Sequence, residues 1–314
     1  MNNLKYYLEK GMILKKINRC ISFTQKQWLK PWIDFNTEKR TKADNDFEKD
    51  FFKLMNNAVF GKTMENVRNH IDFELVNNSQ RLGKIQNEPV FKHAHIINES
   101  LVGVEKIRAV TKLNKPIYLG FNILELSKLH MYKFYYDTLK PFYNDKVKLC
   151  YTDTDSFVLH IETEDVYDDF NKMDDLFDFS SYPSDHKSYS KKNKKVLGKF
   201  KDEVDCKIIE EFIGLKPKMY SIKLHTGKPE GDIKKKAKGI PTHKVKKLIN
   251  FQDYYNTLME NIKRYIKFNT IRSFNHQICS ITCNKLGLSS FDNKRYWLDY
   301  KTSVPYGHYA IATH

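Results

Sequence analysis

The chain has 314 residues and a formal net charge of +16, because 54 lysines and arginines outnumber 38 aspartates and glutamates. That length suffices for a sizeable core in about two or three subdomains and excludes a disordered tail, while the basic excess indicates a polyanionic partner, most commonly nucleic acid. No apolar run reaches the roughly 18 residues of a membrane-spanning helix and no signal peptide begins the sequence, so we expect an intracellular protein with no membrane partner.

The segment from Asp44 to His70 has the strongest helical pattern in the chain. Its apolar stripe, predicted to face the core, consists of Phe51, Leu54, Met55, Ala58 and Val59. Lys53, Asn57 and Phe60 recur at helical spacing on a different face, and Gly61 follows them. Such a face can hold a triphosphate through the lysine while a base lies over the ring and the glycine. Taken alone, the pattern favours an ordinary amphipathic helix.

Residues 71 to 125 alternate apolar and polar positions around polar breaks, which predicts several strands. Within them, His93 and His95 stand two residues apart, which on a strand places both on one face. No carboxylate or cysteine accompanies the pair in the sequence, so we interpret them as surface histidines and not as a metal site. From Ile123 the pattern predicts one amphipathic helix that stops at Pro141.

The stretch from Lys146 to Ile161 contains two runs of alternating apolar and polar residues, which predict a β-hairpin. Asp153 and Asp155 occupy its tip with Thr154 between them. Two carboxylates this close repel each other unless a cation lies beside them, and oxygen ligands favour a hard ion such as Mg²⁺ or Mn²⁺. The alternative is a solvated Asp-Thr-Asp turn, because aspartate is a favoured turn residue.

A second strand pair is predicted over residues 207 to 224, KIIEEFIGLKPKMYSIKL. There Lys218 and Tyr220 lie two residues apart on one strand face. The lysine can reach a phosphate while the tyrosine packs against the adjoining sugar or base. The alternative is a lysine that happens to lie beside a core tyrosine.

The last part of the chain begins with a stretch rich in glycine, proline and lysine, residues 225 to 247, which predicts a subdomain boundary. The remainder up to Tyr300 is predicted to be mostly helical, with apolar positions at Ile271, Phe274, Ile278 and Ile281. The five cysteines of the chain are scattered, which indicates reduced thiols in an intracellular protein.

Three short segments occur in a fixed order: KLMNNAVFG at 53–61, YTDTDS at 151–156 and KMY at 218–220. Because of these segments and their order, the chain resembles the family B DNA polymerases. It resembles specifically the protein-primed type of organelles, viruses and Maverick or Polinton transposons. Further similar segments, such as WLKPWIDFNTEKR near the start and FDNKRY near the end, extend the resemblance from about Leu4 to Tyr309.

The resemblance implies an α+β fold that forms part of a polymerase right hand. Residues 1–70 would form helical fingers, in part, and residues 71–225 an antiparallel-sheet palm that contains the catalytic hairpin. Residues 226–314 would form a mostly helical thumb and a C-terminal segment.

The resemblance also implies roles for the matching residues. Asp155 would be the main ligand, and Asp153 the supporting ligand, of two Mg²⁺ or Mn²⁺ ions in the complete enzyme. The expected nucleotide-binding residues are Lys53, Asn57, Phe60, Gly61 and Tyr151. The residues expected to contact primer-template DNA are Lys218, Tyr220, Thr154 and Ser156. Ala58 and Phe60 replace the serine and tyrosine usual in the first segment, so two pocket hydroxyls are missing.

Two elements of a complete enzyme are missing before Lys53. The family has a metal-binding aspartate there, in a strand resembling DxxSLYP or DANNLYG, and no acid of this chain stands in that context. The carboxylates of a proofreading exonuclease are missing as well. We therefore expect the C-terminal portion of a DNA-directed DNA polymerase, which transfers a nucleotide from a dNTP to a primer 3'-hydroxyl by a two-metal mechanism.

The alternative is a catalytically inactive, DNA-binding remnant of a transposon polymerase. In either case the expected partners are primer-template DNA and dNTP, and the use of a terminal protein as primer is left open. The expected location is intracellular, at the nucleus or a viral replication site. The isolated chain is expected to be inactive or nearly so, because one metal ligand is missing.

Overall fold

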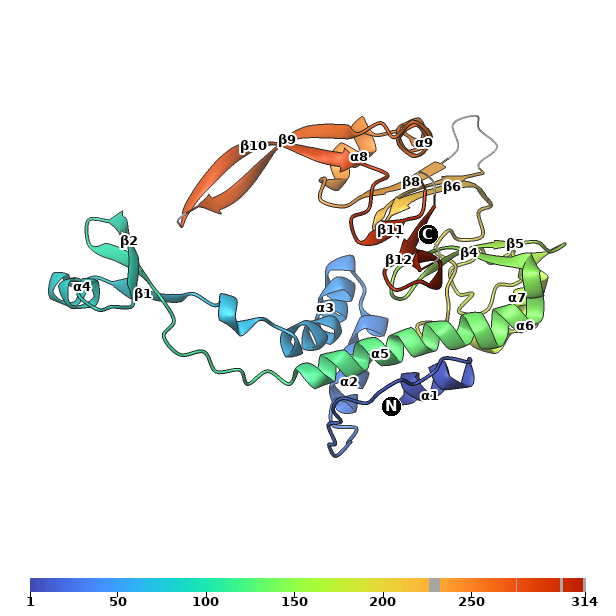
Figure 1. Ribbon diagram of the computed structural model, residues 1–314, viewed down its shortest axis with the longest axis horizontal. Coiled ribbons are helices and arrows are strands. Elements are labelled where there is room, and N and C mark those ends of the chain that lie inside the picture. The colour runs from blue at the N-terminus through green and yellow to red at the C-terminus, as the bar shows by residue number, and fades with distance from the viewer. Residues whose placement is uncertain (226–231, 275, 300–301, 313–314) are drawn as a thin grey trace. The chain divides into compact units, whose positions relative to one another are not determined.

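The computed structural model describes residues 1–225, 232–274, 276–299 and 302–312 (Figure 1). It has a mixed α+β fold in which every pair of named strands among the described residues is antiparallel, so the predicted α+β class is confirmed. In the same residues, no helix combines the length and the apolar character needed to span a bilayer. The chain divides into an N-terminal unit of residues 1–142 and a C-terminal unit of residues 143–314.

The N-terminal unit consists of helices, then a small sheet, then a long helical run. Its elements in chain order are α1 (Asn2–Glu9), α2 (Lys30–Lys42), α3 (Asp46–Thr63), the 3₁₀ helix η1 (Val67–Asn69), β1 (Asp72–Val76), α4 (Ser79–Gln86), β2 (Phe91–Asn98), β3 (Leu101–Lys106), α5 (Ile117–Lys133), the π-helix η2 (Phe134–Leu139) and α6 (Lys140–Tyr143), whose last residue begins the C-terminal unit. Helices α1 and α3 both contact α5, and α2 contacts α3 (Figure 1).

Helix α3 begins where the sequence provides a cap. The Asn45 side-chain oxygen accepts a hydrogen bond from the Glu48 backbone N–H at 2.8 Å, and Asp46 and Glu48 place negative charge in the first turn. The predicted core stripe of this helix is partly wrong, because Phe51 and Leu54 remain 43% and 58% exposed. The other three stripe residues are half-buried. The predicted stripe is wider than the part of α3 that its neighbours cover.

The long helical run differs from the prediction at both ends. Residues from Ile117 onward were expected to continue the strands, but they form the first turns of α5. Gly120 explains part of this outcome, because a Cβ atom there would lie 2.3 Å from the Met64 side chain, so its absence allows the close approach of the segment that ends α3. Pro141 does not stop the run, which passes without a break from the π-helix η2 into α6 and ends at Tyr143.

The small sheet of the N-terminal unit has the strand order β1-β3-β2. Val76, Val104 and Ile85 of α4 are buried together on one face, so α4 covers that face of the sheet. The predicted strands between residues 71 and 106 are therefore confirmed, with one short helix between the first and the second.

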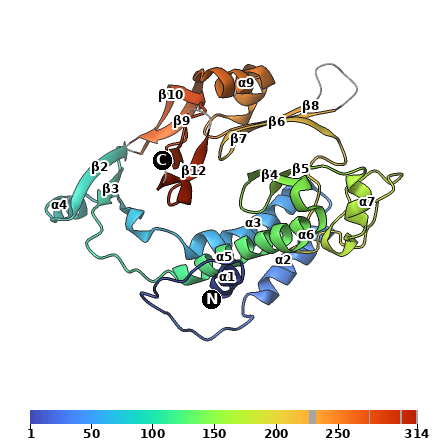
Figure 2. The ribbon, with the colours of Figure 1, turned by 45° about the vertical axis from the view of Figure 1, so that its right-hand side comes forward.

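The C-terminal unit is built mainly from hairpins. Its elements in chain order are the 3₁₀ helix η3 (Asn144–Lys146), β4 (Val147–Thr152), β5 (Phe157–Ile161), α7 (Val166–Asn171), the 3₁₀ helix η4 (Asp174–Leu176), β6 (Ile209–Lys216), β7 (Met219–Leu224), β8 (Asp232–Ala237), α8 (Thr242–Leu248), α9 (Phe251–Glu260), β9 (Arg264–Phe274), β10 (Gln277–Leu288), β11 (Arg295–Trp297), β12 (Ser303–Pro305) and the 3₁₀ helix η5 (Tyr309–Ile311). Strands β6, β7 and β8 form one sheet in that order (Figure 2).

The main core of the C-terminal unit lies between this sheet, the two helices α8 and α9, and the base of the β9–β10 hairpin. It includes Met219 of β7, Val245 of α8, Ile266 of β9 and the fully buried Tyr254 of α9. The Tyr254 hydroxyl donates to the Lys236 carbonyl at 2.9 Å, which satisfies the one polar group that this side chain buries.

The predicted mostly helical character of residues 226–314 is wrong. Helices α8 and α9 are followed by two long antiparallel strands, β9 and β10. The positions that suggested a helical stripe fall on different strands, because the chain reverses between Phe274 and Gln277. Alternate residues Ile266 and Phe268 are buried instead, and β-branched residues are frequent in both strands, which favours extended structure.

The finer division into residues 1–70, 71–225 and 226–314 stays a prediction. The boundary proposed at 225/226 adjoins residues 226–231, which lie outside the described residues.

Candidate functional site

The two strands predicted around the paired acids form a hairpin, as expected. β4 and β5 pair antiparallel, and their register shifts between Leu149 and Tyr151, so that Cys150 is an extra residue. A bulge of this kind bends a strand and changes the direction of the side chains that follow it. Asp153 and Asp155 therefore follow a bent strand and not a flat one.

The tip of the hairpin is a tight turn from Asp153 to Ser156. The Asp153 N–H donates to the Ser156 carbonyl at 3.1 Å, and the Asp155 N–H donates to the Asp153 carbonyl at 2.6 Å. Thr154 has a φ of +57°, a left-handed conformation that is unfavourable for a β-branched residue. Strained residues of this kind cluster at functional sites, so the tip has a local feature that such sites share.

Lys218 connects this tip to the neighbouring hairpin of β6 and β7. It lies in the turn between those strands with a φ of +60°. Its backbone N–H donates to the Tyr151 hydroxyl at 2.8 Å, and its Nζ donates to Asp153 Oδ2 at 2.7 Å. Two of the predicted segments, 65 residues apart at these positions, are therefore in direct contact.

Three aromatic rings lie behind this contact. The ring centroid of Tyr151 is 5.1 Å from that of Tyr220 and 6.0 Å from that of Phe212, and the last two rings are 6.1 Å apart. Burial, followed by the nearby Tyr151, raises the pKa of the Tyr220 hydroxyl, which therefore stays neutral at physiological pH. The sequence indicated both tyrosines. It gave no functional signal for Phe212, which is one of several apolar residues in its strand.

Charge at the tip is partly balanced by the protein itself. The hydrogen bond from Lys218 to Asp153 raises the pKa of the Lys218 ammonium, which stays protonated at physiological pH. The side chains of Asp153 and Lys218 remain 29% and 59% exposed, and ion pairs this exposed contribute little to stability. The Asp155 side chain is exposed, and no hydrogen bond or ion pair to its carboxylate occurs among the described residues of the C-terminal unit.

The donor atoms at the tip suit a hard cation. Two carboxylates with neighbouring hydroxyl and carbonyl groups offer only oxygen, which fits Mg²⁺ or Mn²⁺ better than a softer metal. Within the described part of the C-terminal unit, no third aspartate, glutamate, histidine or cysteine groups with Asp153 and Asp155. The donor chemistry therefore suits a hard divalent ion, and this set of two carboxylates is smaller than a two-ion site needs.

The predicted nucleotide-binding residues of α3 lie in the N-terminal unit. Lys53, Asn57 and Gly61 are exposed along the helix, and Phe60 is half-buried beside them. No hydrogen bond or ion pair of the Lys53 side chain occurs among the described residues of this unit. A Cβ atom added at Gly61 would meet open space, so packing does not require glycine there. The structure brings together Lys218, Tyr220 and the predicted residues of the hairpin tip within the C-terminal unit, and the predicted residues of α3 belong to the N-terminal unit.

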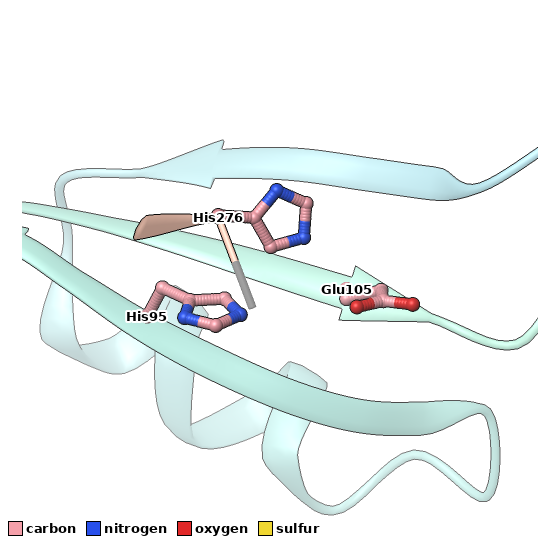
Figure 3. A group of neighbouring side chains, drawn as sticks. All are labelled: His95, Glu105 and His276. Atoms are coloured by element: carbon pink, nitrogen blue, oxygen red, sulfur yellow. The ribbon is translucent and has the colours of Figure 1, made fainter. Parts of the chain in front are cut away.

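A second group of polar side chains was missed in the sequence. His93 and His95 share one face of β2, as predicted, and their ring centroids are 4.2 Å apart. The premise that no carboxylate accompanies them is wrong, because Glu105 of the adjacent strand β3 pairs in register with His93. Figure 3 shows Glu105 and His95 on neighbouring strands; its third labelled residue, His276, belongs to the C-terminal unit. Cross-strand pairing, which brings residues distant in sequence together, explains why the sequence alone did not reveal this group.

Comparisons with models of protein families, with curated proteins and with solved structures find no match to this chain. Any assignment of its function therefore depends on its residues and on their arrangement.

Proposed function

We propose that this chain is the fingers-to-thumb portion of a family B, protein-primed DNA polymerase that transfers nucleotides from dNTP to a primer 3'-hydroxyl. The observation that carries the proposal is the pair of bonds from Lys218, one to Asp153 and one to Tyr151. These residues come from two sequence segments that were singled out independently. Their contact supports a single site, which a chance similarity of short segments would not require.

In this proposal the acids at the hairpin tip serve the reaction centre. Asp153 and Asp155 would hold Mg²⁺ or Mn²⁺, which when bound neutralises phosphate charge and lowers the pKa of a hydroxyl ligand. The weak, exposed ion pair and the strained Thr154 support a functional role, because neither feature is needed for stability.

Lys218 and the aromatic residues behind it would position the primer terminus. The Lys218 ammonium can donate to a backbone phosphate, and the Tyr220 ring can pack against the adjoining sugar. The hydrogen bond to the Tyr151 hydroxyl holds the Lys218 backbone in place. Only the Lys218 side chain would therefore move when its ammonium leaves Asp153 and binds a phosphate. The rings of Tyr151 and Phe212 keep this wall of the site rigid.

The exposed face of α3 would bind the incoming dNTP. Lys53 is available for the triphosphate, and Asn57, Phe60 and Gly61 offer an amide, a ring and an open surface to the base. The open space around Gly61 supports this role, since a glycine that packing does not need leaves room for a flat ligand.

A second candidate function is DNA binding without synthesis. The observation that favours it is the two-carboxylate donor set at the tip, one ligand short of what two ions need. The net charge of +16 suits a polyanion under either function. Both functions place the protein with primer-template DNA, in the nucleus or at a viral replication site, and a terminal protein remains a candidate primer.

A templated primer-extension assay tests these two functions. With labelled primer-template DNA, dNTPs and Mg²⁺ or Mn²⁺, we expect extension at or near background, together with DNA binding and Mn²⁺-dependent dNTP binding that requires Lys53 and Asp155. Robust extension that Asp155→Asn abolishes would contradict the expected inactivity and support a complete polymerase. Binding of neither DNA nor dNTP would contradict both functions.

A further inference from the structure

The β1-β3-β2 sheet of the N-terminal unit has one face that α4 does not cover. Val104 of β3 is buried against α4, and side chains alternate along a strand, so its neighbours Gly103 and Glu105 face the other side. The register pairs Glu105 with His93 and Gly103 with His95. Two imidazoles and one carboxylate therefore share this uncovered face.

Two side chains of this group already lie near each other, and the third is adjacent to one of them. A ring nitrogen of His95 and a carboxylate oxygen of Glu105, both drawn in Figure 3, lie within 4.8 Å of each other. The ring centroids of His93 and His95 are 4.2 Å apart. Because His93 is also the cross-strand partner of Glu105, each of the three residues neighbours the other two. Metal–ligand bonds of about 2 Å then require rotation of the His93 side chain toward the other two and no change in strand register.

An apolar residue walls this group on one side. Phe73 of β1 is the other cross-strand partner of Glu105, and its ring lies where a Cβ atom of Gly103 would be, 2.4 Å from its Cζ. The Glu105 side chain is 13% exposed. A carboxylate with little access to water interacts more strongly with a cation than one on an open surface.

We propose that His93, His95 and Glu105 form a binding site for Zn²⁺ or a similar late transition-metal ion, which links β2 to β3. Imidazole nitrogen with one carboxylate is a donor set that favours such ions over Mg²⁺. Three protein ligands leave a fourth position for water, since Zn²⁺ prefers four ligands. The site is independent of the proposed polymerase function, because it uses none of the residues at the hairpin tip or on α3.

The Lys92 ammonium would compete with a metal ion for the Glu105 carboxylate. The ammonium forms an ion pair with Glu105, so a metal ion has to displace it. The Lys92 side chain is 56% exposed and can move into solvent. Removing this ammonium should therefore strengthen metal binding, whereas removing a ligand should weaken it.

Zn²⁺ affinity of the full chain, measured by titration calorimetry with Zn²⁺ alone, tests the proposal. We expect one site that is weakened at least about tenfold by His95→Gln or Glu105→Gln, because even loss of an outer-shell partner costs about that much. Lys92→Ala should bind Zn²⁺ more tightly than the unmodified chain. The matched control is His243→Ala, which removes an exposed histidine from α8 and should leave the affinity unchanged.

Two further measurements keep the outcome clear. The Co²⁺-loaded chain should show a visible d–d spectrum that the His93→Ala/His95→Ala variant lacks, and far-UV circular dichroism should confirm that the variant is folded. The Asp153→Asn/Asp155→Asn variant should bind Zn²⁺ as tightly as the unmodified chain. This result separates the Zn²⁺ site from the proposed polymerase function, so that either proposal can fail without the other. Equal Zn²⁺ affinity in the unmodified chain and in the double histidine variant would overturn the proposal, as would a Kd weaker than about 1 mM in the unmodified chain.

Discussion

The side chains at the tip of the β4–β5 hairpin are held by interactions that contribute little to stability. Lys218 and Asp153 form a partly exposed ion pair, and Thr154 adopts a left-handed conformation that a β-branched residue normally avoids. A solvated turn selected only for stability would have glycine or asparagine at that position. These features support the proposed role of the tip in binding a ligand.

Replacing Thr154 by glycine should stabilise the protein. The left-handed conformation costs about 1–2 kcal/mol for a residue with a Cβ atom, and glycine loses about 0.5–1 kcal/mol through its greater unfolded-state entropy, so we expect a net gain of up to about 1.5 kcal/mol. Urea unfolding followed by circular dichroism measures the change. Thr152→Gly, inside the strand, is the control and should lower the free energy of unfolding. A similar decrease in both variants would show that the backbone at Thr154 is not strained.

Glu65, just after α3, gives a prediction for acid pH. Hydrogen bonds from Lys62, His70 and Lys115 lower the pKa of its carboxyl to about 2. Because the folded pKa is depressed, the stabilisation is present above the unfolded value of about 4.3 and is lost as the pH falls toward 2. Glu65→Gln should thus be less stable than the unmodified chain at pH 7, with a difference that disappears near pH 2.

Thermal unfolding at pH 7, 4 and 2.5 measures this difference. Glu99→Gln, at an exposed turn, is the control and should change stability little at any of these pH values. A Glu65→Gln difference that stays constant from pH 7 to 2.5 would show that the three hydrogen bonds do not depend on the charge of the carboxylate.

At the scale of elements, the β9–β10 hairpin differs most from expectation. Its apolar positions at 271, 274, 278 and 281 recur at helical spacing, yet Ile271, Phe274 and Ile278 are 74%, 72% and 80% exposed. In β9 the buried residues are Ile266 and Phe268, which alternate with period two and, with Leu288 at the end of β10, join the core of the C-terminal unit. The local spacing of apolar residues predicted a helix here. Strands form instead, because the alternate residues pack against the sheet.

Alanine substitutions in β9 distinguish these two structures. Phe268→Ala should cost about 3–5 kcal/mol, because it removes a buried ring, whereas Ile271→Ala should change stability by less than about 0.5 kcal/mol. Equilibrium urea unfolding measures both. A helix with Ile271 in its apolar stripe predicts the reverse order, and that order would contradict the hairpin.

Sequence patterns identified elements best where the determinants are local. The Asn45 cap of α3 and the turn residues of the β4–β5 hairpin act within a few positions. The hairpin forms as predicted, and α3 forms but ends at Thr63, before the predicted end at His70. Contacts between distant segments could not be read in this way. The close approach at Gly120, which accommodates Met64, and the pairing of Glu105 with His93 both depend on tertiary structure.

At the scale of the whole molecule, the positive charge is not offset by the one acidic segment, residues 162–185, which is followed by a lysine-rich segment, residues 187–203. Lys187 forms ion pairs with Asp165 and Asp168, and Lys192 forms ion pairs with Asp174 and Asp175, so this segment is largely neutralised by the lysine-rich segment that follows it. The excess of +16 is therefore carried by other parts of the chain.

DNA binding should reflect this excess through its salt dependence. Release of counterions from phosphates makes the logarithm of the binding constant fall linearly with the logarithm of salt concentration, by about 0.9 for each phosphate neutralised. Fluorescence anisotropy with a labelled primer-template between about 50 and 200 mM salt measures the slope. We expect a slope of several units; a slope near zero would contradict a polyanionic partner.

The proposed polymerase function requires that Asp153 and Asp155 bind a divalent cation. The most direct test is to measure Mn²⁺ binding to the hairpin tip by electron paramagnetic resonance. We expect Asp155→Asn to weaken Mn²⁺ binding at least about tenfold and Lys218→Met to strengthen it, because the ammonium competes for Asp153. Asp175→Asn, in the acidic segment, should leave the affinity unchanged. Mn²⁺ affinity that is the same in the unmodified chain and in Asp155→Asn would contradict the account.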